Sequence, residues 1–129
     1  MTASKTILVV DDEARLVSLV ETYLTQGGFR VVTASNGREA LSVAERQEPD
    51  LIILDLMMPE MDGWEVYQQM KADETTKDIP VIVVTAKAQS IDKVLGLHIA
   101  KVDDYIAKPF SPQELLASVD SVLGRKQIA

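Results

Sequence analysis

The stretch LIILD at residues 51–55 decides the fold, because four consecutive apolar residues end at a carboxylate, Asp55. The earlier apolar run ILVV at residues 7–10 ends in the same way, at Asp11 and Asp12. An isolated ionised carboxylate is expensive to remove from water. A third apolar run, at residues 106–107, leads into Lys108, so the strand ends carry charges of both signs. Three buried strands that end in this way indicate a site in which opposite charges compensate one another.

Short runs rich in β-branched residues alternate along the chain with longer segments of helical periodicity. This alternation predicts an α/β fold, a doubly wound parallel sheet of five strands with five helices on its two faces. The first, third and fourth strands are nearly continuously apolar, which is typical of central parallel strands, and the other two are expected at the periphery. The expected strands are residues 7–10, 30–34, 51–54, 80–85 and 104–107, and the expected helices are residues 13–26, 38–46, 64–72, 89–100 and 112–124.

Local signals define several helix ends. Gly27-Gly28 supplies a stop for the first helix. The segment Ser111-Pro112-Gln113-Glu114 combines an N-cap serine, a proline at the first helical position and a glutamate three residues after the cap. The fifth helix is expected to end at Gly124, with residues 125–129 as a frayed tail or the start of a linker.

Composition limits the classes of protein that this chain can belong to. A length of 129 residues with 47% apolar and 26% charged residues is enough for one domain, predicted at residues 1–124. The net charge of −7 argues against direct binding of nucleic acid or of an anionic membrane by this domain. The absence of cysteine excludes disulfides and thiolate metal sites. Together with the lack of an apolar export segment in the sequence, this absence favours a cytoplasmic location.

In an open parallel sheet, ligands bind beyond the carboxyl ends of the strands. The side chains expected there are Asp11, Asp12, Asp55, Thr85 and Lys108. Crowded carboxylates repel one another unless a cation is present, and Mg²⁺ is the expected ion because it binds one or two carboxylates, waters and a phosphate group. Asp55 could then act as a nucleophile that forms an acyl phosphate, with positive charge from Lys108 and a hydrogen bond from the Thr85 hydroxyl.

The alternative is that these aspartates only cap helices or face solvent. Asp11 and Asp12 could cap the first helix, and Thr85 could cap the fourth. That interpretation does not extend to Asp55, which no helix follows immediately, or to Lys108, which precedes a proline and is expected to be extended.

Taken together, these motifs resemble the receiver domains of two-component response regulators, and they span nearly the whole chain in that family's order. The matching segments are residues 7–13 (ILVVDDE), 55–63 (DLMMPEMDG), 85–86 (TA) and 103–110 (DDYIAKPF).

The resemblance implies a flavodoxin-like sheet with strand order 2-1-3-4-5 and a phosphorylation-dependent switch. It implies that Asp55 accepts phosphate from a histidine kinase or phosphotransfer protein, and that Mg²⁺ is held by Asp12, Asp55 and the Met57 backbone carbonyl, with Asp11 acting through water. Thr85 and Tyr105 would relay the change to the surface formed by the fourth helix, fifth strand and fifth helix. The partner there would be a downstream protein or an output domain. Such a protein is a regulator rather than an enzyme, although it assists its own phosphorylation and dephosphorylation.

The chain departs from the family pattern at two places. Lys101 and Val102 replace a Gly-Ala pair, in a segment one residue longer than usual, so the end of the fourth helix is expected to be irregular. Leu95 and Ser118 replace arginines that pair receivers attached to winged-helix DNA-binding domains, which argues against that mode of dimerisation.

Other classes of function fit the sequence less well. An aspartyl-phosphate hydrolase of the haloacid-dehalogenase kind needs an acid two residues after its nucleophile, where this chain has Met57. A degenerate receiver acting as a phosphate-independent scaffold would not need to retain Asp12, Asp55, Thr85 and Lys108. No glycine-rich nucleotide-binding motif occurs in the sequence.

Overall fold

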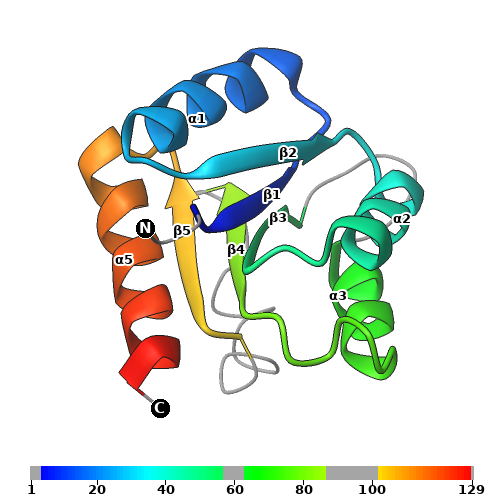
Figure 1. Ribbon diagram of the computed structural model, residues 1–129. Coiled ribbons are helices and arrows are strands. Elements are labelled where there is room, and N and C mark those ends of the chain that lie inside the picture. The colour runs from blue at the N-terminus through cyan, green and yellow to red at the C-terminus, as the bar shows by residue number, and fades with distance from the viewer. Residues whose placement is uncertain (1–3, 57–62, 87–101, 129) are drawn as a thin grey trace.

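The computed structural model describes residues 4–56, 63–86 and 102–128, with residues 85, 86 and 125–128 described by their backbone alone. Five parallel strands form one sheet in the order β2-β1-β3-β4-β5, which confirms the predicted fold and the central placement of the three apolar strands (Figure 1). The strands are β1 (Thr6–Val10), β2 (Arg30–Ala34), β3 (Leu51–Asp55), β4 (Val81–Ala86) and β5 (Asp104–Lys108).

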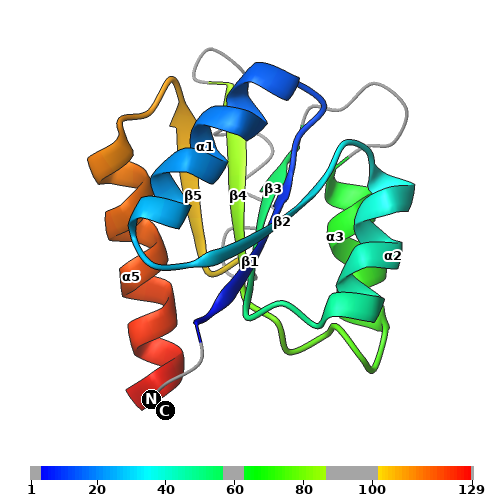
Figure 2. The same ribbon diagram turned by 45° about the horizontal axis from the view of Figure 1, so that its top comes forward.

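Four helices lie in the described part of the chain, two against each face of the sheet (Figure 2). One face carries α1 and α5 and the other carries α2 and α3. The helices are α1 (Ala14–Gln26), α2 (Gly37–Gln47), α3 (Gly63–Ala72) and α5 (Pro112–Ile128). The helix predicted at residues 89–100, and Lys101 after it, lie outside the described residues.

Alternation of side chains along the strands divides the core into two layers. Leu8, Ile52 and Val83 face α2 and α3, while their neighbours Ile53 and Ile82 face α1 and α5. Each of these side chains is at most 3% exposed. Central strands buried on both faces explain why they are apolar without interruption in the sequence.

The capping box predicted at the start of the fifth helix is confirmed, and α2 also begins with a side-chain cap. Ser111 Oγ accepts a hydrogen bond from the Glu114 N–H at 3.1 Å, and Glu114 Oε1 accepts one from the Ser111 N–H at 2.9 Å. At the start of α2, Asn36 Oδ1 accepts from the Glu39 N–H at 2.8 Å. Both arrangements satisfy backbone donors that a helix leaves unpaired in its first turn.

The predicted end of the fifth helix at Gly124 is wrong, because α5 continues to Ile128. A glycine inside a helix costs only about 1 kcal/mol relative to alanine, so it ends a helix only where the backbone also turns away. At Gly27-Gly28 the backbone does turn, and Gly28 has a φ of +93°.

Candidate functional site

Strand register brings the charged ends of β1, β3 and β5 to one edge of the sheet. Val10 is aligned with Leu54 on neighbouring strands, so Asp11 and Asp55 follow at corresponding positions. Lys108 is the last residue of β5, two strands beyond β3 in the sheet. The predicted convergence of acidic and basic residues at the carboxyl edge is therefore present.

Asp11, Asp12 and Asp55 form an acidic cluster in which one carboxylate oxygen of each residue lies within 4.8 Å of the others. Asp11 and Asp55 are buried, with exposures of 5% and 2%, whereas Asp12 is exposed. Oxygen donors at this spacing suit a hard divalent cation such as Mg²⁺. The cluster is thus open to solvent at Asp12 and closed around the other two carboxylates.

Lys108 supplies positive charge to this cluster. Its Nζ lies 3.0 Å from Asp11 Oδ2, 3.5 Å from Asp55 Oδ2 and 4.0 Å from Glu13 Oε1. Burial alone lowers the pKa of Lys108, but the hydrogen bond to Asp11 and the charges of Asp55, Asp11 and Glu13 outweigh it and raise that pKa above its usual value. The lysine is therefore a permanent cation at neutral pH. One cation only partly offsets the negative charge of three clustered carboxylates. The remaining negative charge would favour binding of a metal ion.

Asp11 is held at both of its oxygens. Oδ2 contacts Lys108, and Oδ1 accepts a hydrogen bond from the Glu13 N–H at 2.9 Å. The N-cap residue of α1 is Glu13, whose side chain makes no capping hydrogen bond. Asp11 therefore does more than cap a helix, because its Oδ2 contacts Lys108 while its Oδ1 accepts from the Glu13 N–H.

Gly63 allows α3 to begin directly against the end of β3. A Cβ on Gly63 would lie 2.7 Å from the carbonyl oxygen of Asp55 and would also overlap the backbone of Leu56. The Gly63 N–H donates to the Leu56 carbonyl oxygen at 3.1 Å. The glycine of the DG pair at residues 62–63 thus lets a helix support the strand end that carries Asp55.

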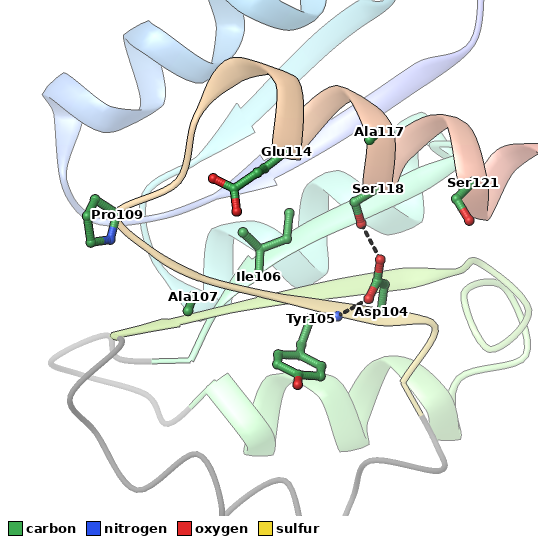
Figure 3. A pocket seen from close by; sticks show the side chains of 9 residues that line it. All are labelled: Asp104, Tyr105, Ile106, Ala107, Pro109, Glu114, Ala117, Ser118 and Ser121. Carbon is green, nitrogen blue, oxygen red and sulfur yellow. Dashed lines mark hydrogen bonds between the residues drawn. The ribbon is translucent and has the colours of Figure 1, made fainter.

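Tyr105, the second predicted switch residue, is 41% exposed at the rim of a hollow of about 520 Å³ between β5 and α5 (Figure 3). Asp104 is held in this hollow by two hydrogen bonds, from the Ser118 hydroxyl at 2.6 Å and from the Tyr105 N–H at 2.8 Å. The hollow is lined by Asp104, Tyr105, Ile106, Ala107, Pro109, Glu114, Ala117, Ser118 and Ser121. Ser118, which replaces an expected arginine, thus contacts an acidic residue of its own chain.

Two predicted site residues lie wholly or partly outside the described structure. Met57 lies outside the described residues. Thr85 is described only by its backbone, which is aligned with Ala107 in the pairing of β4 with β5. The contact of Glu13 with Lys108 and the close approach at Gly63 were not predicted from the sequence, although both residues lie within the family motifs.

Comparisons with known proteins agree with this geometry. Residues 7–120 match the family described as the response regulator receiver domain. The chain is 48% identical over 126 residues to the alkaline phosphatase synthesis transcriptional regulatory protein PhoP of Bacillus subtilis, covering 98% of this chain and 51% of that protein. It is 45% identical over 121 residues to the phosphate regulon transcriptional regulatory protein PhoB of Pseudomonas aeruginosa, covering 94% of this chain and 52% of that protein. The chain thus spans about half the length of these relatives.

Solved structures show the same fold. A response regulator from Chloroflexus aurantiacus superimposes with a TM-score of 0.86 at 34% identity, covering 95% of this chain and 99% of that one. The receiver domain of a sensor histidine kinase from Pseudomonas aeruginosa gives a TM-score of 0.84 at 34% identity with the same coverage, and has a magnesium ion coordinated in its active-site cleft.

The chain belongs to the receiver domains of the response regulators of two-component signalling. None of the helices in the described ranges is both long enough and apolar enough to span a membrane.

Proposed function

We propose that this domain is a phosphorylation-dependent switch in which Asp55 accepts one phosphoryl group from a histidine kinase or phosphotransfer protein. The observation that carries this proposal is the position of Lys108 Nζ, 3.5 Å from Asp55 and 3.0 Å from Asp11 within a cluster of three carboxylates. A nucleophilic carboxylate with a fixed cation beside it is suited to accept a group that carries negative charge.

The donor set fits Mg²⁺. We assign Asp12 and Asp55 as direct ligands, Asp11 as a ligand through water and the Met57 carbonyl as a further ligand. Bound there, the ion would supply the second positive charge that phosphoryl transfer requires. The exposure of Asp12 supports its assignment as a direct ligand, since Asp11 already has contacts at both oxygens.

In the transfer step, an oxygen of Asp55 attacks phosphorus and forms an O–P bond while the P–N bond of a phosphohistidine breaks. The electron pair of the broken bond stays on the imidazole nitrogen. Lys108 offsets the charge of the transferred oxygens, and the Thr85 hydroxyl donates a hydrogen bond to one of them. The product is an acyl phosphate whose water-mediated hydrolysis returns Asp55 to its carboxylate form.

Thr85 and Tyr105 would pass this change to the surface formed by the fourth helix, β5 and α5. The partner on that surface is a downstream protein or an output domain of a longer chain, and the transcriptional relatives support a DNA-binding output. The domain itself, at residues 1–124, would not bind nucleic acid, since the chain carries a charge of −7. We place the protein in the cytoplasm, where kinase and target would meet it.

Incubation with acetyl phosphate and Mg²⁺, followed by intact mass spectrometry, tests the proposal. Wild-type protein should gain one phosphoryl group, Asp55→Asn should gain none, and Asp12→Ala should be labelled only slowly although Asp55 is intact. Equal labelling of wild type and Asp55→Asn would refute the assignment of the phosphoacceptor. Undiminished labelling of Asp12→Ala would place the metal elsewhere.

A further inference from the structure

Glu13 lies next to the acidic cluster of Asp11, Asp12 and Asp55 but is not one of its three members. It follows Asp12 in the chain and is the N-cap of α1. Its Oε1 lies 4.0 Å from Lys108 Nζ, and its side chain is 63% exposed, whereas those of Asp11 and Asp55 are 6% and 3% exposed. Glu13 therefore places a negative charge on the solvent side of the lysine.

The charge of Glu13 would persist when the cluster is neutralised. The three carboxylates that lie within 4.8 Å of one another are Asp11, Asp12 and Asp55. A cation bound by these three would offset their charge and not that of Glu13. Because phosphoryl transfer depends on positive potential at the transferred group, a nearby exposed carboxylate opposes the approach of an anionic donor.

We propose that Glu13 is a specificity-determining residue that selects phosphodonors by charge. This inference rests on the proposed function of Asp55. The Glu13 carboxylate lowers the positive potential that Lys108 offers to the solvent, so a donor with more negative charge is penalised more than one with less. The chain thereby disfavours small, doubly charged acyl phosphates and leaves phosphorylation to a donor whose docking to the protein offsets the penalty.

The side chain of Glu13 can be changed without disturbing the start of α1. It makes no capping hydrogen bond, and the contact with Asp11 uses the backbone N–H of Glu13. Glu13→Gln removes the charge at nearly constant shape, while Glu13→Asp retains it. Glu21→Gln is a matched control, since Glu21 is an exposed acid on the same helix.

The test compares initial rates of labelling at Asp55 by acetyl phosphate, a dianion at neutral pH, and by phosphoramidate, which carries less net negative charge. In Glu13→Gln the ratio of the acetyl phosphate rate to the phosphoramidate rate should rise roughly threefold, as expected for one exposed charge near the reacting group. Glu13→Asp should return the ratio toward the wild-type value, and Glu21→Gln should leave it unchanged. Added salt should reduce the difference between wild type and Glu13→Gln.

A merely structural role for Glu13 would change the rates with both donors by the same factor, and that result, or an unchanged ratio, would overturn the inference. The same experiment separates this failure from failure of the proposed function. If neither donor labels Asp55 in the wild-type protein, the phosphoacceptor assignment itself is wrong, and the selection by Glu13 fails with it.

Discussion

Lys108 Nζ lies 3.0 Å from Asp11 Oδ2, although Asp11 follows β1, Lys108 ends β5, and β3 and β4 lie between these two strands in the sheet. The lysine side chain therefore reaches back across the ends of the intervening strands, one of which carries Asp55. A single ion pair therefore links β5 to the end of β1 at the carboxyl edge of the sheet. A change in charge at Asp55 would alter a contact shared by β1 and β5.

Mg²⁺ should stabilise the folded protein through the acidic cluster. At a concentration of roughly ten times its dissociation constant, the ion should add about 1.4 kcal/mol to the free energy of unfolding and raise Tm by about 3–6 °C. Thermal unfolding followed by circular dichroism with and without MgCl₂ measures this shift. Asp12→Asn should remove most of it, and Glu45→Gln, at an exposed acid on α2, should not. An equal shift in wild type and Asp12→Asn would contradict the metal assignment.

Replacement of Gly63 by alanine should damage both stability and the phosphoacceptor site. The new Cβ would meet backbone atoms of Asp55 and Leu56, so the end of β3 or the start of α3 must move. We expect a loss of about 2 kcal/mol or more in the free energy of unfolding, measured with urea, and slower labelling of Asp55.

The matched control is Gly124→Ala, where a Cβ meets nothing within 4 Å inside α5. This variant should be neutral or up to about 1 kcal/mol more stable than wild type, because alanine is the better helix former. If Gly63→Ala were as stable as Gly124→Ala, the close approach at Gly63 would not constrain the site.

Tyr67 should ionise at higher pH than an ordinary tyrosine. Burial, and next the charge of Asp103, raise its pKa above the usual value of 10.0. The stability that the neutral phenol contributes is therefore fully present below pH 10.0 and is lost as the pH rises through the raised pKa.

Ultraviolet titration of the phenolate band, with Tyr67→Phe to assign the late component, tests this expectation. Asp103→Asn should lower the pKa of Tyr67 and can still accept the hydrogen bond that Asp103 accepts from the Val81 N–H. Asp104→Asn, at the neighbouring residue, is the control and should leave the Tyr67 titration unchanged. A late component that survives in Tyr67→Phe would assign the shift to another tyrosine.

The hydrogen bond from Ser118 to Asp104, which links α5 to β5, should contribute to the free energy of unfolding (Figure 3). Ser118→Ala should cost about 1–2 kcal/mol of unfolding free energy, because a buried hydroxyl that donates to a charged acceptor is removed. In a double-mutant cycle with Asp104→Ala, the two losses should be less than additive. Strict additivity of the two changes would mean that the contact makes no net contribution in solution.

The sequence predicts the central strands and the convergence of Asp11, Asp12, Asp55 and Lys108, because strand ends and apolar runs are local signals and the parallel topology brings the ends together. The strand order was implied only by the resemblance to receiver domains, because local signals do not say which strands are neighbours. The end of α5 was mispredicted because the effect of a glycine depends on its backbone angles, which Gly124 and Gly28 do not share. The contact between Glu13 and Lys108 depends on where a long side chain reaches across the sheet edge. Sequence spacing contains no information on that path.

Peptide mapping of the phosphorylated protein is the most direct test of the central claim that Asp55 is the phosphoacceptor. After brief incubation with acetyl phosphate and Mg²⁺, tandem mass spectrometry at low pH should find the phosphoryl group on the peptide that contains Asp55, at one group per chain. Chelation of Mg²⁺ before incubation should prevent its appearance. A phosphoryl group located on Asp11, Asp12 or any other residue, with Asp55 unmodified, would contradict the account.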